Sequence, residues 1–134
     1  MEYPAIWITG NPKTKGSWIP VKTKTGIKFR PATKGGSKWY KDAREAVTAQ
    51  WRRPPIEEGP VRCRLLFLLP RPKTVVRKYP TSRYDGDIDK LTRAILDSMT
   101  GVVYKDDSQV VSAPVDKRYA DAEAGVWVHV DTDL

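Results

Sequence analysis

The segment from Pro60 to Leu69 constrains the fold of this chain more than any other. Its apolar residues alternate along one face, as in a strand whose side chains point to opposite sides in turn, and they are Val61, Cys63, Leu65, Phe67 and Leu69. The other face begins with two arginines and becomes apolar at Leu66 and Leu68. A strand that is apolar on both faces is typical of the centre of a sheet. We therefore expect a central strand over residues 60–69, covered on both sides at one end.

The clearest helix is predicted over residues 87–100. Asp87 is a suitable N-cap, and Gly101 provides the signal for the C-terminal end. The apolar side chains recur at helical spacing and form one stripe, made of Ile88, Leu91, Ala94, Ile95 and Met99. The connection from residue 70 to residue 86 is a long basic loop, and loops of that length are often functional.

Other segments also have the spacing of regular structure. They predict strands over residues 3–9, 110–119 and 125–131, a hairpin that turns at Thr25-Gly26 between residues 22 and 29, and a helix from Ser37, its N-cap, to about Trp51. This order of elements favours an α+β fold with one mixed sheet and two main helices. A length of 134 residues fits a single domain over residues 1–134.

Several features exclude other classes of protein. The longest apolar run, Leu65 to Leu69, is far shorter than the roughly 20 residues that span a bilayer, so no membrane partner is expected. The first residues lack the pattern of a secretory signal. Cys63 is the only cysteine, which excludes an internal disulfide and a cysteine-based zinc site. These features predict a protein of the reducing cytoplasm.

The charge is distributed unevenly along the chain. Residues 1–84 hold 19 Lys and Arg against 5 Asp and Glu, whereas residues 85–134 hold 5 against 11. The basic part predicts a polyanionic partner, because cations bind phosphates with release of counterions. Carboxylates would repel the same phosphates. A divalent metal ion bound between the carboxylates and the phosphates would remove this repulsion. The alternative is that the imbalance is only a solvated surface.

Acidic residues cluster around the predicted helix 87–100. Asp85, Asp87 and Asp89 stand at its entrance, Asp97 lies further along it, and Asp106-Asp107 follows the next turn. A short extended connection would return Asp106-Asp107 beside the start of the helix. Such a cluster suits Mg²⁺, which prefers oxygen ligands.

Arg93 lies four residues after Asp89, and it would orient that carboxylate or bind the scissile phosphate. A purely structural alternative makes Asp87 a cap, Asp89 and Arg93 a surface ion pair, and Asp106-Asp107 a turn.

Two segments with these acids resemble a known family. They are Asp87-Ile88-Asp89-Lys90-Leu91-Thr92-Arg93-Ala94-Ile95-Leu96-Asp97, followed by Thr100-Gly101, and Tyr104-Lys105-Asp106-Asp107-Ser108-Gln109-Val110. Together they resemble the signature of the RusA-type Holliday junction resolvases. Gly10-Asn11-Pro12-Lys13-Thr14-Lys15 and Val115-Asp116-Lys117-Arg118-Tyr119 also resemble that family.

The resemblance implies a homodimeric, Mg²⁺-dependent endonuclease that nicks two strands symmetrically across a four-way DNA junction, with Mn²⁺ as a substitute metal. It places such a protein in the cytoplasm of a bacterium or of a phage-infected host. Asp87, Asp89 and Asp107 match the family's catalytic and metal-binding acids, and Asp106 would be an accessory ligand. Arg93 stands where the family has a catalytic lysine, which keeps the positive charge but not easy proton transfer. Because Gly86 replaces a frequent proline, Asp85 is an alternative member of the first acidic pair.

The basic segments are expected to bind the arms of the junction, mainly through phosphates. The expected contacts are Lys13, Lys15, Lys22, Lys24, Arg71, Lys73, Lys90 and Lys117. Trp18, Trp39 and Tyr84 would stack on splayed bases or fill the core. Two other functions fit the same residues, namely a non-catalytic DNA-binding module and a nuclease that acts on flaps, forks or other branched DNA.

Overall fold

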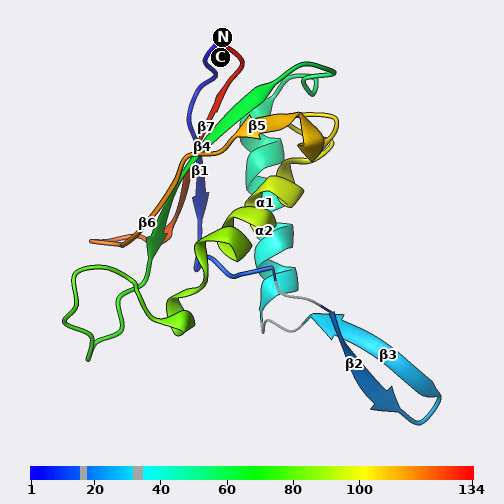
Figure 1. Ribbon diagram of the computed structural model, residues 1–134, viewed down its shortest axis with the longest axis vertical. Coiled ribbons are helices and arrows are strands. Elements are labelled where there is room, and N and C mark those ends of the chain that lie inside the picture. Colours follow the sequence, from blue (N-terminus) through cyan, green and yellow to red (C-terminus); the bar gives the residue numbers. More distant parts are fainter. Residues whose placement is uncertain (16–17, 32–34) are drawn as a thin grey trace.

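Strand β4 (Val61–Leu69) lies in the middle of a mixed sheet, as its sequence predicts. The computed structural model, which describes residues 1–15, 18–31 and 35–134, pairs β4 antiparallel with β7 (Gly125–Asp131). On its other side β4 pairs in parallel with β5 (Val110–Ser112) and β6 (Val115–Tyr119). Strand β1 (Ile6–Thr9) pairs with the outer side of β7 and completes the five-stranded sheet (Figure 1).

Two helices pack against one face of this sheet. They are α1 (Gly36–Trp51) and α2 (Ile88–Met99), and both lie on the same side of it (Figure 1). The alternating apolar residues of β4 are buried there together with most of the predicted stripe of α2. Leu91, Ile95 and Met99 are fully buried, whereas Ile88 at the start of the helix is 40% exposed. Within the described ranges, no helix is long and apolar enough to span a membrane. The α+β class, the mixed sheet and the two helices are confirmed.

The second face of the sheet differs from the prediction. Leu66 and Leu68 are only half-buried, and no helix of the described part covers them. Trp7 and Trp127 contact each other on neighbouring strands, with ring centroids 5.0 Å apart. The prediction of cover on both faces of β4 was therefore wrong, because the chain places both helices on the same side.

Three predicted boundaries also changed. The strand predicted over residues 110–119 is two strands, β5 and β6, separated at Ala113-Pro114, because proline has no N–H to donate to a ladder. The first strand begins at Ile6, although Tyr3 still donates its N–H to the Val130 carbonyl at 3.0 Å. Helix α1 begins at Gly36 after Gly35, which has a φ of 79°, and no side chain caps it, so Ser37 is not the N-cap.

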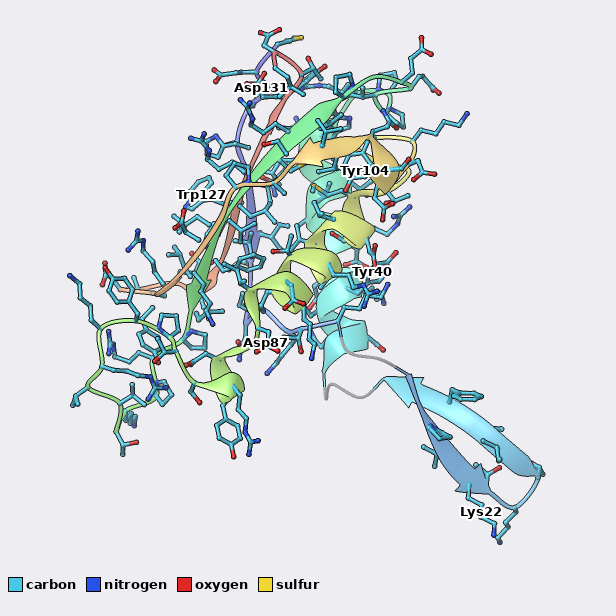
Figure 2. All side chains as sticks on the ribbon, in the orientation of Figure 1. Lys22, Tyr40, Asp87, Tyr104, Trp127 and Asp131 are labelled. Carbon is cyan, nitrogen blue, oxygen red and sulfur yellow. The ribbon has the colours of Figure 1, made fainter. Side chains whose placement is uncertain are left out.

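The predicted hairpin is present and extends away from the sheet and helices. It consists of β2 (Trp18–Thr23) and β3 (Gly26–Pro31), which form a separate two-stranded sheet (Figure 1). Lys22 lies near its far end (Figure 2). Ile27 and Phe29 are 68% and 64% exposed, so the hairpin presents apolar side chains to solvent.

Replacing Gly125 with alanine is expected to destabilise the fold. An added Cβ would lie 2.3 Å from the Ile8 carbonyl oxygen and 2.6 Å from the Trp7 ring, so β1 would have to move. We expect a loss of about 1–3 kcal/mol, measured as a lower midpoint of thermal unfolding. Gly59→Ala is the comparison without a steric clash, since its added carbon meets no atom within 4 Å and any loss of stability there comes from its φ of 95° alone. An unchanged midpoint for Gly125→Ala would contradict the close approach of these strands.

Candidate active site

The start of α2 is held by contacts from distant parts of the chain. Gly86 precedes it with a φ of 98°, and a Cβ there would lie 3.0 Å from Thr14 and 3.2 Å from Leu91. Lys117 of β6 donates to the Gly86 carbonyl oxygen at 2.9 Å. Only glycine fits this turn without strain, and the turn fixes the direction in which the following acids project.

Asp87 occupies the N-cap position of α2 but does not act as a cap. Its side chain makes no capping hydrogen bond, and it pairs instead with Lys90 at 3.5 Å. The side chain is more than half exposed. The position predicted for Asp87 is therefore confirmed, and its carboxylate faces solvent rather than the helix N–H groups.

Asp89, Arg93 and Asp97 share one face of α2, because residues four apart are neighbours on a helix. Asp89 and Arg93 are exposed, and no described residue forms a hydrogen bond or ion pair with either. The surface ion pair that the structural alternative assigned to them is absent from the described part of the chain. Asp97 forms an ion pair with Lys15, which also donates its backbone N–H to the Lys90 carbonyl at 3.1 Å.

Asp107 does not return to the start of α2, so that prediction was wrong. The residues after Met99 fold into a tight turn, in which Val102 and Val103 donate to the Met99 carbonyl oxygen at 3.0 and 2.9 Å. The Tyr104 hydroxyl donates to the Leu96 carbonyl oxygen and fixes the turn against α2. Since this path is a turn rather than an extended strand, it cannot retrace the helix, and Asp107 arrives beside Asp97.

The two neighbouring acids after this turn have opposite environments. Asp106 caps the short helix η2 (Asp107–Gln109) and accepts the Ser108 N–H at 2.9 Å, which lowers the pKa of Asp106. Desolvation, followed by the nearby Asp97 and Asp106 carboxylates, raises the pKa of Asp107. Asp106 therefore has the turn role of the structural alternative. Asp107 lies beside the Asp97 carboxylate, and a bound cation would offset the repulsion between these two charges.

The acids fit a hard divalent cation in chemistry but are not gathered into one complete site. In residues 1–15, 18–31 and 35–134, no three acidic, histidine or cysteine side chains lie close enough together to hold one metal ion. Burial first, and then the nearby Asp97 carboxylate, raises the pKa of Asp107, and carboxylate oxygens are the donors that Mg²⁺ uses. Asp89 and Asp97 lie on the same helix face with Arg93 between them, and these two acids are called the acidic stripe of α2 below.

The predicted DNA-binding cations divide into two groups. Four of them, Lys13, Lys22, Lys24 and Lys73, have no hydrogen-bond or ion-pair partner within the described ranges. The other four bind within the protein: Lys15 to Asp97, Lys90 to Asp87, Lys117 to Gly86, and Arg71 to the Val75 and Arg77 carbonyl oxygens. Arg71 also lies over the Tyr119 ring, 4.3 Å from its centroid.

The predicted stacking residues also differ in position. Tyr84 is almost fully exposed, whereas Trp39 is buried in the core and cannot stack on DNA. The Trp18 side chain lies outside the part of the structure that can be described.

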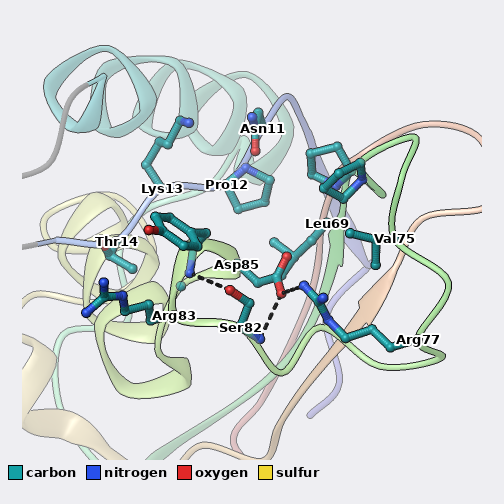
Figure 3. A pocket seen from close by; sticks show the side chains of 14 residues that line it. Asn11, Pro12, Lys13, Thr14, Leu69, Val75, Arg77, Ser82, Arg83 and Asp85 are labelled. Atoms are coloured by element: carbon teal, nitrogen blue, oxygen red, sulfur yellow. Dashed lines mark hydrogen bonds and ion pairs between the residues drawn. The ribbon is translucent and has the colours of Figure 1, made fainter.

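Asp85 anchors the long basic loop and is not a free acid. Its Oδ2 accepts from the Arg77 guanidinium at 3.1 Å, the Ser82 N–H at 3.0 Å and the Tyr119 hydroxyl at 3.2 Å. Figure 3 shows the first two of these contacts. The carboxylate is 7% exposed, so its alternative role beside Asp87 would require this network to break.

Asp85→Ala is expected to lower the free energy of unfolding by about 2–3 kcal/mol, because it removes an acceptor from three donors. Trypsin should also cut the loop over residues 70–86 faster, since the loop would lose its anchor. Thermal unfolding and limited proteolysis measure the two effects. The exposed Asp121→Ala should change the stability by less than about 0.5 kcal/mol. Equal behaviour of the two variants would show that Asp85 does not anchor the loop.

The sequence placed Asp97 in the acidic cluster and Arg83 in the basic loop, but it did not name either as a specific ligand or contact at the site. Asp97 could have been found from its spacing, since it follows Asp89 and Arg93 at intervals of four residues on a helix. Its partner Lys15 is 82 residues away in sequence, and no local pattern predicts that contact. Arg83 lies in the basic loop, and only the folded structure shows that it borders a cavity next to the start of α2.

An α+β domain that is basic overall and carries an acidic stripe on one helix has the features of an enzyme that acts on nucleic acid. The family model for endodeoxyribonuclease RusA matches residues 10–131, nearly the whole chain. The chain therefore belongs to the RusA endodeoxyribonuclease family, which confirms the resemblance found in the sequence. Membership makes it a DNA endonuclease and implies Holliday junction resolvase activity.

One relative is similar over a large part of its length. It is the uncharacterized protein YqaN of Bacillus subtilis (strain 168), which is 31% identical over 97 residues. The aligned region covers 63% of this chain and 67% of YqaN.

Proposed function

We propose that this protein is a homodimeric, Mg²⁺-dependent nuclease that resolves four-way DNA junctions by paired symmetric nicks, with Mn²⁺ as a substitute metal. The observation that carries the proposal is the acidic stripe of α2, met by Asp107, on a domain that is otherwise basic. A dimer suits the substrate, because the two-fold axis of a dimer matches that of a junction. Two equivalent sites would then cut strands of like polarity in one encounter.

Asp87, Asp89 and Asp107 are the residues proposed to hold the metal, with Asp106 as an accessory ligand. The described residues do not gather these acids into one site, so the proposal requires the segment after α2 to move toward Asp87 and Asp89 when the metal binds. When bound, Mg²⁺ supplies an activated water molecule and stabilises the charge that develops on the phosphate. Asp87 and Asp89 are exposed to incoming DNA. Arg93 has no acidic partner in the described part, which favours the role of binding the scissile phosphate over that of orienting Asp89.

The hairpin β2–β3 is proposed to contact an arm of the junction. Lys22, Lys24 and Lys28 are exposed on it, and Ile27 and Phe29 are exposed beside them. An isolated two-stranded hairpin is marginally stable in water, and a two-stranded ribbon fits a DNA groove. Exposed apolar side chains on such a ribbon can insert between base steps, as in proteins that bend DNA.

Metal binding should be detectable without DNA. Ca²⁺ or Mg²⁺ at about 100 times its Kd should stabilise the fold by about 2.7 kcal/mol, which raises the midpoint of thermal unfolding by several degrees. The variants Asp89→Asn and Asp107→Asn should each lose this rise, and the exposed Asp121→Asn should keep it. If divalent ions change the wild type no more than the same ionic strength of NaCl, the acids are structural and the non-catalytic DNA-binding module is favoured.

A further inference from the structure

A cavity of about 630 Å³ lies next to the start of α2. The segment that follows β1 and the basic loop over residues 70–86 form its walls (Figure 3). Gly86 lines this cavity and is followed directly by Asp87. Its volume is within the range of pockets that hold a small molecule or one unit of a polymer. Whatever occupies the cavity therefore lies next to Asp87, the first of the acids proposed to hold the metal.

The charge of the cavity favours an anionic ligand. Lys13 and Arg83 line it, and neither has an acidic partner within the described ranges. The other two charged groups of the lining, Arg77 and Asp85, are paired with each other at 3.1 Å. The cavity thus presents two cations whose charge is not compensated, and Arg83 offers the planar fork that suits a phosphate.

The remaining lining favours a flat apolar group attached to that anion. Pro12 and Pro72 contribute apolar walls, and Tyr84 stands at the cavity with 88% of its surface exposed. The Arg83 guanidinium lies 5.5 Å from the centroid of the Tyr84 ring, which brings the cation and the aromatic face together. An exposed tyrosine beside a free cation is suited to a base that stacks while its phosphate is neutralised.

We propose that this cavity holds one unstacked nucleotide of the DNA strand, next to the phosphate that the α2 acids cut. Lys13 and Arg83 bind its phosphate, and its base stacks on Tyr84. The proposal rests on the proposed function and adds a reason for the choice of branched DNA. A nucleotide leaves the stack at a branch point at lower cost than inside a duplex, because its neighbours are already interrupted.

Filling the cavity tests this proposal. Val75 lines it, whereas the adjacent Val76 does not and is 96% exposed, so Val75→Trp and Val76→Trp form a matched pair. In EDTA, fluorescence anisotropy should show about tenfold weaker binding of a four-way junction by Val75→Trp, with little change for a linear duplex. Val76→Trp should bind both DNAs as the wild type does. Equal junction binding by the two variants would overturn the proposal.

Cross-linking of the wild type gives a second measurement that does not depend on how a variant folds. A four-way junction with 5-iodouracil at a branch-point nucleotide is irradiated in EDTA, and the adduct is mapped by mass spectrometry. We expect the adduct on Tyr84, and none there when the iodouracil is at the centre of an arm. An adduct outside the cavity, or the same adduct from both positions, would overturn the proposal.

Failure of this inference can be distinguished from failure of the proposed function. If the wild type cross-links through Tyr84 but cuts no branched DNA in Mg²⁺, the nucleotide site is supported and the resolvase function is contradicted. If the wild type cuts the junction but cross-links elsewhere, the resolvase function is supported and the nucleotide site is contradicted.

Discussion

Replacement of Asp89 with asparagine is expected to slow cleavage of a four-way junction by at least about 10³-fold. The variant keeps the size of the side chain but loses the charge that holds the metal, and metal catalysis contributes several kcal/mol at about 1.4 kcal/mol per tenfold in rate. Asp89 is exposed and its side chain forms no hydrogen bond or ion pair with a described residue, so the fold should be unchanged. Single-turnover cleavage in Mg²⁺, with thermal unfolding alongside, measures the effect.

Asp121→Asn is the matched control, since it removes one exposed carboxylate outside α2. It should cut at the wild-type rate, and both variants should still bind the junction in EDTA. A wild-type rate for Asp89→Asn would remove this residue from the proposed site. A general loss of binding would show instead that the substitution disturbs the DNA surface.

Affinity for the junction is expected to fall steeply with salt. If six or more phosphates are contacted, the association constant should drop by about 10³-fold or more between 50 and 200 mM salt. The lysines of the hairpin and the loop whose side chains have no partner among the described residues are the groups expected to carry this dependence. Fluorescence anisotropy over a salt series measures it, and a flat response would contradict the role of the basic part of the chain.

The structure makes the salt experiment more specific. Replacing both Lys22 and Lys24 by glutamine should make the slope of log K against log salt shallower by about two. Both ammonium groups are exposed and have no partner within the described ranges. Lys117→Gln should leave the slope unchanged, because its ammonium group donates to the Gly86 carbonyl oxygen. Equal slopes for all three proteins would show that the hairpin does not contact phosphates.

The elements with strong periodicity could be predicted from sequence. The alternation of β4 and the apolar stripe of α2 each match one period over many residues, and both were confirmed. Boundaries that depend on single residues were harder. Ser37 has the chemistry of an N-cap, yet α1 begins one residue earlier, after a left-handed Gly35. The break between β5 and β6 follows from Pro114, whose effect the continuous apolar pattern concealed.

The contacts that shape the site depend on tertiary structure. Residues 102–104 have an apolar pattern that suits a strand or a buried turn equally, and the hydrogen bond from Tyr104 to the Leu96 carbonyl oxygen selects the turn. That choice moves Asp107 from the start of α2 to Asp97. The hydrogen bonds from Lys117 to the Gly86 carbonyl oxygen and from the Tyr119 hydroxyl to Asp85 likewise join residues more than 30 apart in sequence. Local spacing could therefore not show which charged side chains are already bound within the protein.

Cleavage of a four-way junction by the wild type tests the central claim most directly. The junction and a linear duplex with the same arm sequences are incubated with Mg²⁺ or with EDTA, and the nicks are mapped on every strand. Our account predicts nicks in the junction alone, only with Mg²⁺, paired symmetrically on two strands of like polarity. Cleavage of flaps or forks but not junctions would assign another branched substrate. Tight junction binding without any cleavage in Mg²⁺ would contradict the nuclease mechanism and leave a DNA-binding module.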